Sequence, residues 1–265
     1  MLEELMNKVL KLFPIKKNAK HTNIFEELIH EAKKYFNNEE ILLIKKAYLI
    51  AKDLHRGQKR NSGEPYIIHP LYVAYYLLTE LELHDANSIA ASLLHDTVED
   101  CGITHEFLTK RFNQDVANLV LGVTKMKDLD FTSKEEKEEY NNYLLLKYIL
   151  QDYRVIYIKL ADRLHNMKTL DYKSEAKRRK KSAETLRIFV PLATHVGANI
   201  VRDELADISF KYLNNRSYRE IKGMSEDYKR KHISEIEVTL NQLKNLLINN
   251  GITPEIRPHM MNRFA

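Results

Sequence analysis

The sequence predicts an all-α protein, and three observations support this fold class. Glycine and proline are scarce, with 7 and 6 residues respectively among 265, which favours long helices over a strand-rich sandwich. Apolar residues recur three or four positions apart along much of the chain, which is the spacing of one helix face. Residues 38–40 (Asn-Glu-Glu) are typical of a helix start, because acidic side chains favour the positive end of the helix dipole.

The first half of the chain is expected to hold several amphipathic helices. Residues 1–13 and 24–36 are predicted to form two of them, separated by Pro14. The helix that starts at residues 38–40 should continue through Ile41, Ala47 and Ile50 to Leu54.

Three later segments of this half also have helical signals. Pro70 is expected to begin a helix that places Val73, Tyr76 and Leu77 on one face. The apolar run at residues 90–94 indicates a buried helix, and Thr104 is a suitable cap for a short helix that follows it.

The second half opens with a charged stretch. Residues 128–140 are interpreted as a solvated loop that enters a helix, and the alternative is a flap over a pocket. Asp152 should cap the next helix. The β-branched residues at 155, 156 and 158 would suit a strand, but the four-residue spacing of Leu160 and Leu164 favours a helix.

The remaining segments are also predicted to be helical. Residues 184–213 and 226–249 should form two or three helices. The basic run at residues 177–181 is interpreted as a solvated helix face, and the alternative is a patch that attracts phosphate or nucleic acid. It contains no aromatic residues, which argues against binding of single strands.

Composition and charge limit the class of protein. At 265 residues the chain can bury a full core, as one large domain or two small ones. Its formal charge of +5, from 42 basic and 37 acidic residues, is compatible with an anionic ligand. Because acidic residues are interspersed almost everywhere, we expect no nucleic-acid partner.

Cysteine content and the terminus indicate the compartment. Cys101 is the only cysteine, so no disulfide can form within the chain, and we interpret this residue as a packing residue. The N-terminus begins Met-Leu-Glu-Glu, without the profile of a signal peptide. No uncharged apolar run approaches the length of a membrane span. We therefore expect a cytoplasmic protein without membrane contact.

The most informative motif is His95-Asp96-Thr97-Val98-Glu99-Asp100. On a helix, residues four apart share a face, so His95 should lie beside Glu99 and Asp96 beside Asp100. Three carboxylates this close repel one another unless a positive charge lies among them. A divalent metal would supply that charge, since His and Asp are good ligands. The alternative is a solvated acidic helix face.

Two distant segments offer further ligands. His69 follows an apolar pair at the end of a Gly- and Pro-rich loop, and Asp162 is interleaved with apolar residues at helical spacing. Taken singly, a core histidine or a salt-bridged aspartate explains each of them. Together with His95 and Asp96 they make a set of two histidines and two aspartates, which predicts a metal site. His55 is interpreted as a supporting or structural residue.

These segments resemble the HD-type hydrolase domain of the Rel/Spo enzymes, which make and destroy the alarmones guanosine tetra- and pentaphosphate. The resemblance runs from about residue 41 to residue 213. It rests on residues 60–70, 95–100, 159–167 and a stretch from 184 to 207. It implies an HD-domain helical bundle at residues 37–200, preceded by helices at 1–36. Residues 201–265 would be a C-terminal helical extension that resembles the start of a truncated synthetase region.

The resemblance also implies roles for individual residues. His69, His95, Asp96 and Asp162 would hold Mn²⁺, although other divalent ions remain possible, and Glu99 and Asp100 would be the catalytic acidic pair. The alternative for this pair is charge balance or orientation of His95. The substrate-binding residues would be Arg60, Asn61, Ser62, Asn166 and Thr169. The family often has lysine where this chain has Asn61, so one positive charge is missing.

The expected activity is removal of the 3′-pyrophosphate from the alarmone, which gives GDP or GTP and pyrophosphate. The metal would lower the pKa of the attacking water. Two alternatives stay open: an HD phosphohydrolase that acts on another nucleotide, and a catalytically silent regulatory remnant. The chain ends at Ala265 without a synthetase domain. This favours either a hydrolase-only relative or a truncated product of a longer protein.

Overall fold

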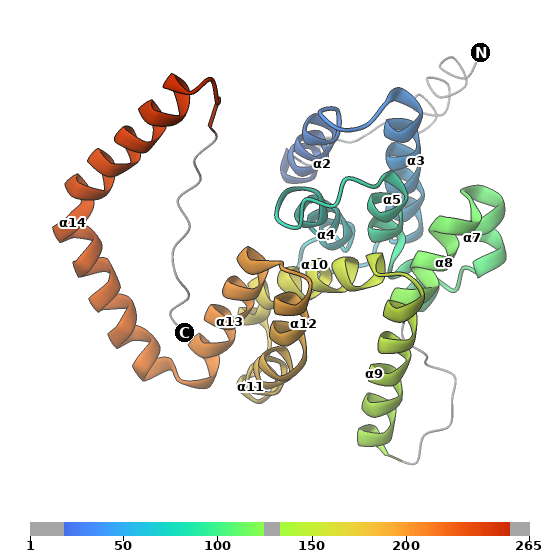
Figure 1. Ribbon diagram of the computed structural model, residues 1–265. Coiled ribbons are helices and arrows are strands. Elements are labelled where there is room, and N and C mark those ends of the chain that lie inside the picture. Colours follow the sequence, from blue (N-terminus) through green and yellow to red (C-terminus); the bar gives the residue numbers. More distant parts are fainter. Residues whose placement is uncertain (1–18, 125–132, 255–265) are drawn as a thin grey trace. The chain divides into compact units, whose positions relative to one another are not determined.

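The computed structural model describes residues 19–124 and 133–254 and confirms the all-α fold (Figure 1). Over these ranges the regular structure is helical, and the extended pairing is limited to one bridge between Lys59 and Pro65. The predicted helix at residues 1–13 and the tail after residue 254 lie outside the described ranges. The chain forms two compact units, Met1–Val155 and Ile156–Ala265, and each is described by itself.

The first unit is built around a central helix, α5. Its elements are α2 (Ala19–Ala32), α3 (Asn38–Leu54), α4 (Ile68–Thr79), α5 (Ala86–Leu94), α6 (Thr97–Cys101), α7 (His105–Arg111), α8 (Gln114–Val123) and α9 (Lys134–Gln151). Helix α5 packs against α3, α4 and α8. Its small residues Ala90, Ala91 and Ser92 are fully buried, so neighbouring helices can approach its backbone closely.

Side-chain caps fix several helix starts where the sequence predicts them. Asn37 and Glu40 form a reciprocal capping box: the Asn37 side chain accepts the Glu40 N–H at 3.1 Å, and the Glu40 carboxylate accepts the Asn37 N–H at 2.9 Å. Thr104 caps α7 by accepting the Phe107 N–H at 3.1 Å. Pro70 is the third residue of α4 rather than its first.

The helix expected to run through the His-Asp motif is interrupted, so that prediction was wrong. Helix α5 ends at Leu94 and α6 begins at Thr97. Asp96 adopts φ −95° and ψ −4°, a sparsely occupied conformation in which active-site residues recur. The Thr97 hydroxyl donates to the Leu94 carbonyl at 2.6 Å and so satisfies a carbonyl at the break. The hydrogen bond from the Asp100 N–H to the Asp96 carbonyl, at 2.8 Å, persists.

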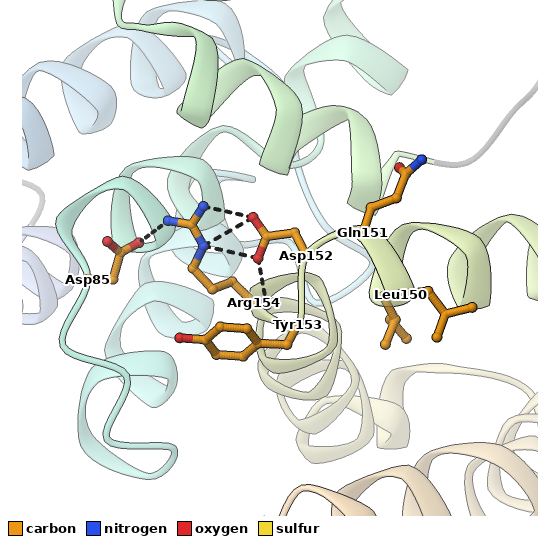
Figure 2. Close-up of a pocket in the computed structure, with 7 residues that line it drawn as sticks. Asp85, Leu150, Gln151, Asp152, Tyr153 and Arg154 are labelled. Atoms are coloured by element: carbon orange, nitrogen blue, oxygen red, sulfur yellow. Dashed lines mark hydrogen bonds and ion pairs between the residues drawn. The ribbon is translucent and has the colours of Figure 1, made fainter.

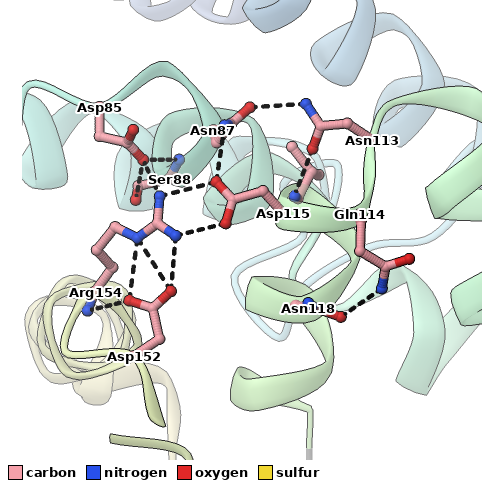
Figure 3. A network of polar contacts seen from close by, with 10 residues as sticks. Asp85, Asn87, Ser88, Asn113, Gln114, Asp115, Asn118, Asp152 and Arg154 are labelled. Atoms are coloured by element: carbon pink, nitrogen blue, oxygen red, sulfur yellow. Dashed lines mark hydrogen bonds and ion pairs between the residues drawn. The ribbon is translucent and has the colours of Figure 1, made fainter.

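Arg154 is the hub of a polar network in the first unit (Figure 3). Its guanidinium donates to Asp152 at 2.7 Å, to Asp115 at 2.5 Å and to Asp85 at 3.1 Å. Hydrogen bonds to Asp152 and Asp115 hold the pKa of Arg154 above its ordinary value. Asp152 accepts the Arg154 N–H at 2.9 Å, as its predicted capping role requires. The junction of α9 and α10 is thereby tied to the segments that carry Asp85 and Asp115.

The second unit contains most of α10 and the elements after it. The elements are α10 (Arg154–Lys168), η1 (Leu170–Tyr172), α11 (Glu175–Glu184), η2 (Thr185–Phe189), α12 (Val190–His195), α13 (Asn199–Leu213) and α14 (Asn215–Asn249). Helix α10 confirms the helical prediction for its β-branched start. Helix α14 begins at Asn215 rather than near 226, with Asn214 as its side-chain cap. Helices α11 and α12 both pack against α13.

The basic run lies on α11. Four of its five residues are exposed, and Arg178 is half-buried, with its guanidinium 5.6 Å from the centre of the Tyr212 ring. Lys181 pairs with Glu184 at 2.8 Å within the same helix. This arrangement agrees with the interpretation of a solvated helix face.

Candidate metal centre

Three of the four predicted ligands meet within the first unit. His69 is the second residue of α4, His95 follows the last residue of α5, and Asp96 precedes α6. Oδ2 of Asp96 lies 3.1 Å from Nε2 of His95 and 3.6 Å from Nε2 of His69. Both imidazoles are buried, whereas the Asp96 side chain is 18% exposed. The break between α5 and α6 therefore places Oδ2 of Asp96 close to both ring nitrogens.

The hydrogen bonding of His95 makes its facing nitrogen a suitable ligand. Its Nδ1 lies 2.7 Å from the backbone carbonyl oxygen of Ser92, and a carbonyl only accepts, so Nδ1 carries the hydrogen. In the neutral ring Nε2 is then an acceptor that faces another acceptor on Asp96. A divalent cation between them would resolve this conflict, and such a backbone contact is the usual second bond of a metal-ligating histidine.

The spacing of these atoms also fits a common ion. Two ligand atoms that are each about 2.1 Å from one metal lie roughly 3.0–3.6 Å apart for angles from about 90° to 120°. Both distances to Asp96 Oδ2 fall in that interval. The donor set of imidazole nitrogen and carboxylate oxygen suits Mn²⁺, Zn²⁺ or Fe²⁺ better than Ca²⁺.

The acidic pair lies on α6, directly after Asp96. Glu99 is half-buried and Asp100 is exposed. The Tyr66 hydroxyl lies 2.6 Å from Oδ2 of Asp96 and 3.2 Å from Oδ2 of Asp100, which places these two carboxylates side by side. Burial, and then the charge and hydrogen bond of Asp96, raise the pKa of Tyr66 far above its ordinary value, so the phenol is a donor at neutral pH.

The fourth predicted ligand, Asp162, lies on the part of α10 that belongs to the second unit. Its carboxylate accepts from Nδ2 of Asn166 at 2.6 Å and lies 3.7 Å from Nζ of Lys159. The predicted substrate residue Asn166 thus shares a helix face with Asp162. Thr169 follows the end of α10, and its hydroxyl donates to the His165 carbonyl at 3.0 Å.

A tight loop presents the other predicted substrate residues. The Arg60 N–H donates to the Glu64 carbonyl at 2.8 Å, and the Gly63 N–H donates to the Arg60 carbonyl at 2.9 Å. Gly63 has φ +84°, a left-handed conformation that favours glycine. Asn61, at the tip, is exposed, and Arg60 and Ser62 are half-buried.

His55 contacts two residues of the segment that carries this loop, Gln58 and Tyr66. Its Nδ1 lies 2.8 Å from Oε1 of Gln58, and its ring stacks on Tyr66 with centroids 4.6 Å apart. Cys101 lies beside it, and its thiol donates to the Leu54 carbonyl at 3.5 Å. Burial raises the pKa of the Cys101 thiol, which fits a packing residue rather than a nucleophile.

Two features are absent from the sequence-based predictions. Tyr66 was not singled out, because a tyrosine in a loop has no pattern that marks it as a site residue. The other is an open cavity of about 570 Å³ at the junction of α9 and α10, lined by residues 149–154 and Asp85 (Figure 2). Figure 2 shows Arg154 between the carboxylates of Asp85 and Asp152 in its wall. None of the predicted site residues lines this cavity.

Comparison with known proteins identifies the family. The chain matches the HD domain family over residues 47–199, more than half of its length. It is 41% identical over 225 residues to a GTP pyrophosphokinase of Myxococcus xanthus, a match that covers 84% of this chain. It is 40% identical over 226 residues to the bifunctional (p)ppGpp synthase/hydrolase SpoT of Escherichia coli, covering 83% of this chain.

A solved structure agrees with this assignment. It is that of a metazoan ortholog of SpoT that hydrolyzes ppGpp; the TM-score is 0.53 at 25% identity, over 65% of this chain and 96% of that one. The chain therefore belongs to the HD domain family. Within that family it carries the HD domain of the Rel/Spo proteins, as the sequence motifs imply.

The matches cover only part of the longer relatives. The chain spans 30% of the Myxococcus protein and 32% of the Escherichia protein. The names of these relatives include both synthase and hydrolase activities, so a name alone does not assign an activity to this chain. Over the part of the chain that the structure describes, no helix combines the length and the apolar character needed to cross a membrane.

Proposed function

We propose that this protein hydrolyses the 3′-pyrophosphate of guanosine tetra- and pentaphosphate in a metal-dependent reaction, giving GDP or GTP and pyrophosphate. The observation that carries the proposal is the approach of His69 and His95 to one oxygen of Asp96, at 3.6 and 3.1 Å. The matched family region, residues 47–199, contains every proposed site residue.

The proposed ligands are His69, His95, Asp96 and Asp162, and the proposed ion is Mn²⁺. Their donor atoms, imidazole nitrogen and carboxylate oxygen, are of the kinds that hold such an ion. A divalent ion at this position supplies Lewis acidity, which lowers the pKa of a coordinated water and offsets phosphate charge.

In the proposed reaction, Glu99 and Asp100 transfer protons. One of Glu99 and Asp100 accepts a proton from the attacking water, and the other delivers a proton to the departing ribose oxygen. The water oxygen forms a bond to the phosphorus attached to the ribose 3′ oxygen. The bond between that phosphorus and the 3′ oxygen breaks, so the nucleotide leaves with a 3′ hydroxyl group.

The loop residues bind the guanine nucleotide. The planar guanidinium of Arg60 can stack on a base or bind phosphate, and Asn61 and Ser62 lie beside it. We propose that Asn166 and Thr169 contact the nucleotide as well. Asn166 already donates to Asp162, so it would link substrate and ligand.

Product analysis with competing nucleotides tests the proposal. Metal-stripped protein is supplied with Mn²⁺ and an equimolar mixture of ppGpp, GTP and ATP, and the products are separated by ion-exchange chromatography. Pyrophosphate and GDP from ppGpp, with the other nucleotides intact, is the expected result. Preferential loss of GTP or ATP would assign the site to another nucleotide, and no turnover by folded, metal-loaded protein would indicate a silent remnant.

A matched pair of variants tests the ligand set. Asp162→Asn should weaken Mn²⁺ binding by at least about tenfold, because it removes an anionic ligand. Asp53→Asn is the control, since Asp53 is exposed and pairs with Arg56 on the surface. Equal Mn²⁺ affinity in both variants would remove Asp162 from the ligand set.

A further inference from the structure

Tyr66 occupies a position between two groups with different proposed tasks. Its hydroxyl oxygen lies 2.6 Å from Oδ2 of Asp96, a proposed metal ligand, and 3.2 Å from Oδ2 of Asp100, a proposed proton-transfer group. The Tyr66 ring is fixed on two sides. It stacks on His55 at 4.6 Å and meets the edge of His69 at 6.0 Å. The hydroxyl can therefore rotate its hydrogen while the ring stays in place.

The hydroxyl has a single hydrogen and faces two acceptors, so it donates fully to only one of them at a time. The shorter contact, to Asp96, uses the same oxygen that faces Nε2 of His95 at 3.1 Å. A metal ion held by that oxygen and the imidazoles would withdraw its electron density and weaken it as an acceptor. The Asp100 carboxylate would then be the stronger acceptor.

We propose that Tyr66 is a positioning residue that links metal occupancy to the catalytic carboxylate. Without metal, the hydroxyl donates to Asp96, its nearer acceptor. With metal bound, the hydroxyl donates to Asp100 and fixes its carboxylate for proton transfer. This inference rests on the proposed function for its kinetic consequence, but the change of hydrogen-bond partner can be observed without turnover.

Tyr66→Phe removes the hydroxyl and keeps the ring that stacks on His55. Tyr212→Phe is a matched control, because the Tyr212 hydroxyl donates to Asp171 at 2.7 Å in the other unit. Both variants lose one bond from a phenol to a carboxylate. A general loss of stability would therefore affect both, whereas the proposed role affects only the first.

Kinetics and metal binding give the first readout. For Tyr66→Phe with saturating Mn²⁺, kcat for ppGpp should fall about 10- to 100-fold, the range expected for loss of a hydrogen bond to a charged group. The KM should change less than about twofold, and the Mn²⁺ dissociation constant, from the electron paramagnetic resonance of free Mn²⁺, less than about threefold. A large loss of Mn²⁺ affinity, an unchanged kcat, or an equal kcat loss in Tyr212→Phe would overturn the inference.

Near-ultraviolet absorption gives a readout that needs no activity. The chain has 15 tyrosines and no tryptophan, so this region reports tyrosine environments. Adding Mn²⁺ to metal-stripped wild type should give a tyrosine difference band that is absent in Tyr66→Phe and altered in Asp100→Asn. Bound Mn²⁺ without this band contradicts the inference. The band without pyrophosphate release supports the link through Tyr66 while contradicting the proposed function.

Discussion

Arg163 and Glu184 form an ion pair at 2.6 Å that fastens α10, next to the proposed ligand Asp162, to the end of α11. The Arg163 guanidinium also lies 3.9 Å from the centre of the Phe189 ring, at the end of the π-helical segment η2. Glu184 has a second partner in Lys181 at 2.8 Å. The turn of α10 that carries Asp162 is therefore anchored within the second unit by contacts that involve no substrate.

This ion pair predicts a pH-dependent contribution to stability. Burial alone would raise the pKa of Glu184, but the charges and hydrogen bonds of Arg163 and Lys181 outweigh it and lower the pKa to about 2. Because the folded-state pKa lies below the unfolded value, the stabilisation is complete above about pH 4.5 and is lost as the pH falls toward 2.

The substitution Glu184→Gln should therefore lower the unfolding free energy at pH 7 by roughly 2–3 kcal/mol, since it leaves a largely buried guanidinium without its anion. Urea unfolding at pH 7 and at pH 3 measures this, and the difference from wild type should shrink at the lower pH. The control is Glu220→Gln, whose exposed carboxylate pairs with Arg216 on α14. An equal loss of unfolding free energy in both variants would show that the Arg163–Glu184 pair stabilises the protein no more than an exposed ion pair does.

Arg154 should be more important for stability than a surface arginine. It is the common donor to Asp85, Asp115 and Asp152, and its side chain is only 18% exposed. Arg154→Met would leave these carboxylates close together without a cation and should cost about 2–4 kcal/mol. Thermal unfolding measures the loss.

Arg216→Met is the comparison, because the Arg216 side chain is 91% exposed. Its unfolding free energy should change by less than about 0.5 kcal/mol. Equal melting temperatures for the two variants would contradict a stabilising role for the Arg154 network.

Two glycines in helices should respond oppositely to alanine. A Cβ at Gly122 in α8 would meet Cγ2 of Val155 at 2.8 Å, so Gly122→Ala should destabilise the first unit by about 1–3 kcal/mol. A Cβ at Gly223 in α14 meets nothing within 4 Å, so Gly223→Ala should stabilise its helix by roughly 0.5–1 kcal/mol. Chemical denaturation measures the unfolding free energy of each variant. A change in the same direction for both would contradict the difference in packing.

The loop of residues 60–64, which we propose binds the nucleotide, should gain affinity for the alarmone when a positive charge is added to it. Asn61 is exposed at the tip of the loop beside Arg60. Asn61→Lys should lower the KM for the alarmone severalfold at low salt, and the gain should fade as ionic strength rises. Asn249→Lys adds the same charge on the exposed end of α14, so an equal decrease in its KM would attribute the effect to net charge.

The sequence predicted features that depend on local chemistry. The capping signals near Asn38 and at Thr104 were correct because a cap and its helix are neighbours in the chain. His69, His95 and Asp96 were expected to lie together because polar side chains next to apolar segments are costly to bury unless they share a partner, and the structure brings them together. The HD domain prediction was also correct, since its motifs keep their order along the chain.

Features that depend on distant contacts were not predictable in the same way. The break between α5 and α6 follows from φ and ψ at Asp96, for which helical periodicity gives no signal. The Arg154 network joins residues up to 69 positions apart. Tyr66 contacts Asp96, 30 positions away, only because the fold brings the two residues together. Such contacts depend on how distant segments pack together. A short stretch of sequence carries no information about that packing.

In the proposed reaction, water attacks the phosphorus attached to the ribose 3′ oxygen, at a centre that contains His69, His95 and Asp96. Hydrolysis of ppGpp by Mn²⁺-loaded wild type in water labelled with heavy oxygen tests this directly, with mass spectrometry of both products. Attack at this phosphorus predicts one labelled oxygen in the pyrophosphate and none in GDP. Label in the GDP, or no pyrophosphate from folded, Mn²⁺-loaded protein, would contradict it.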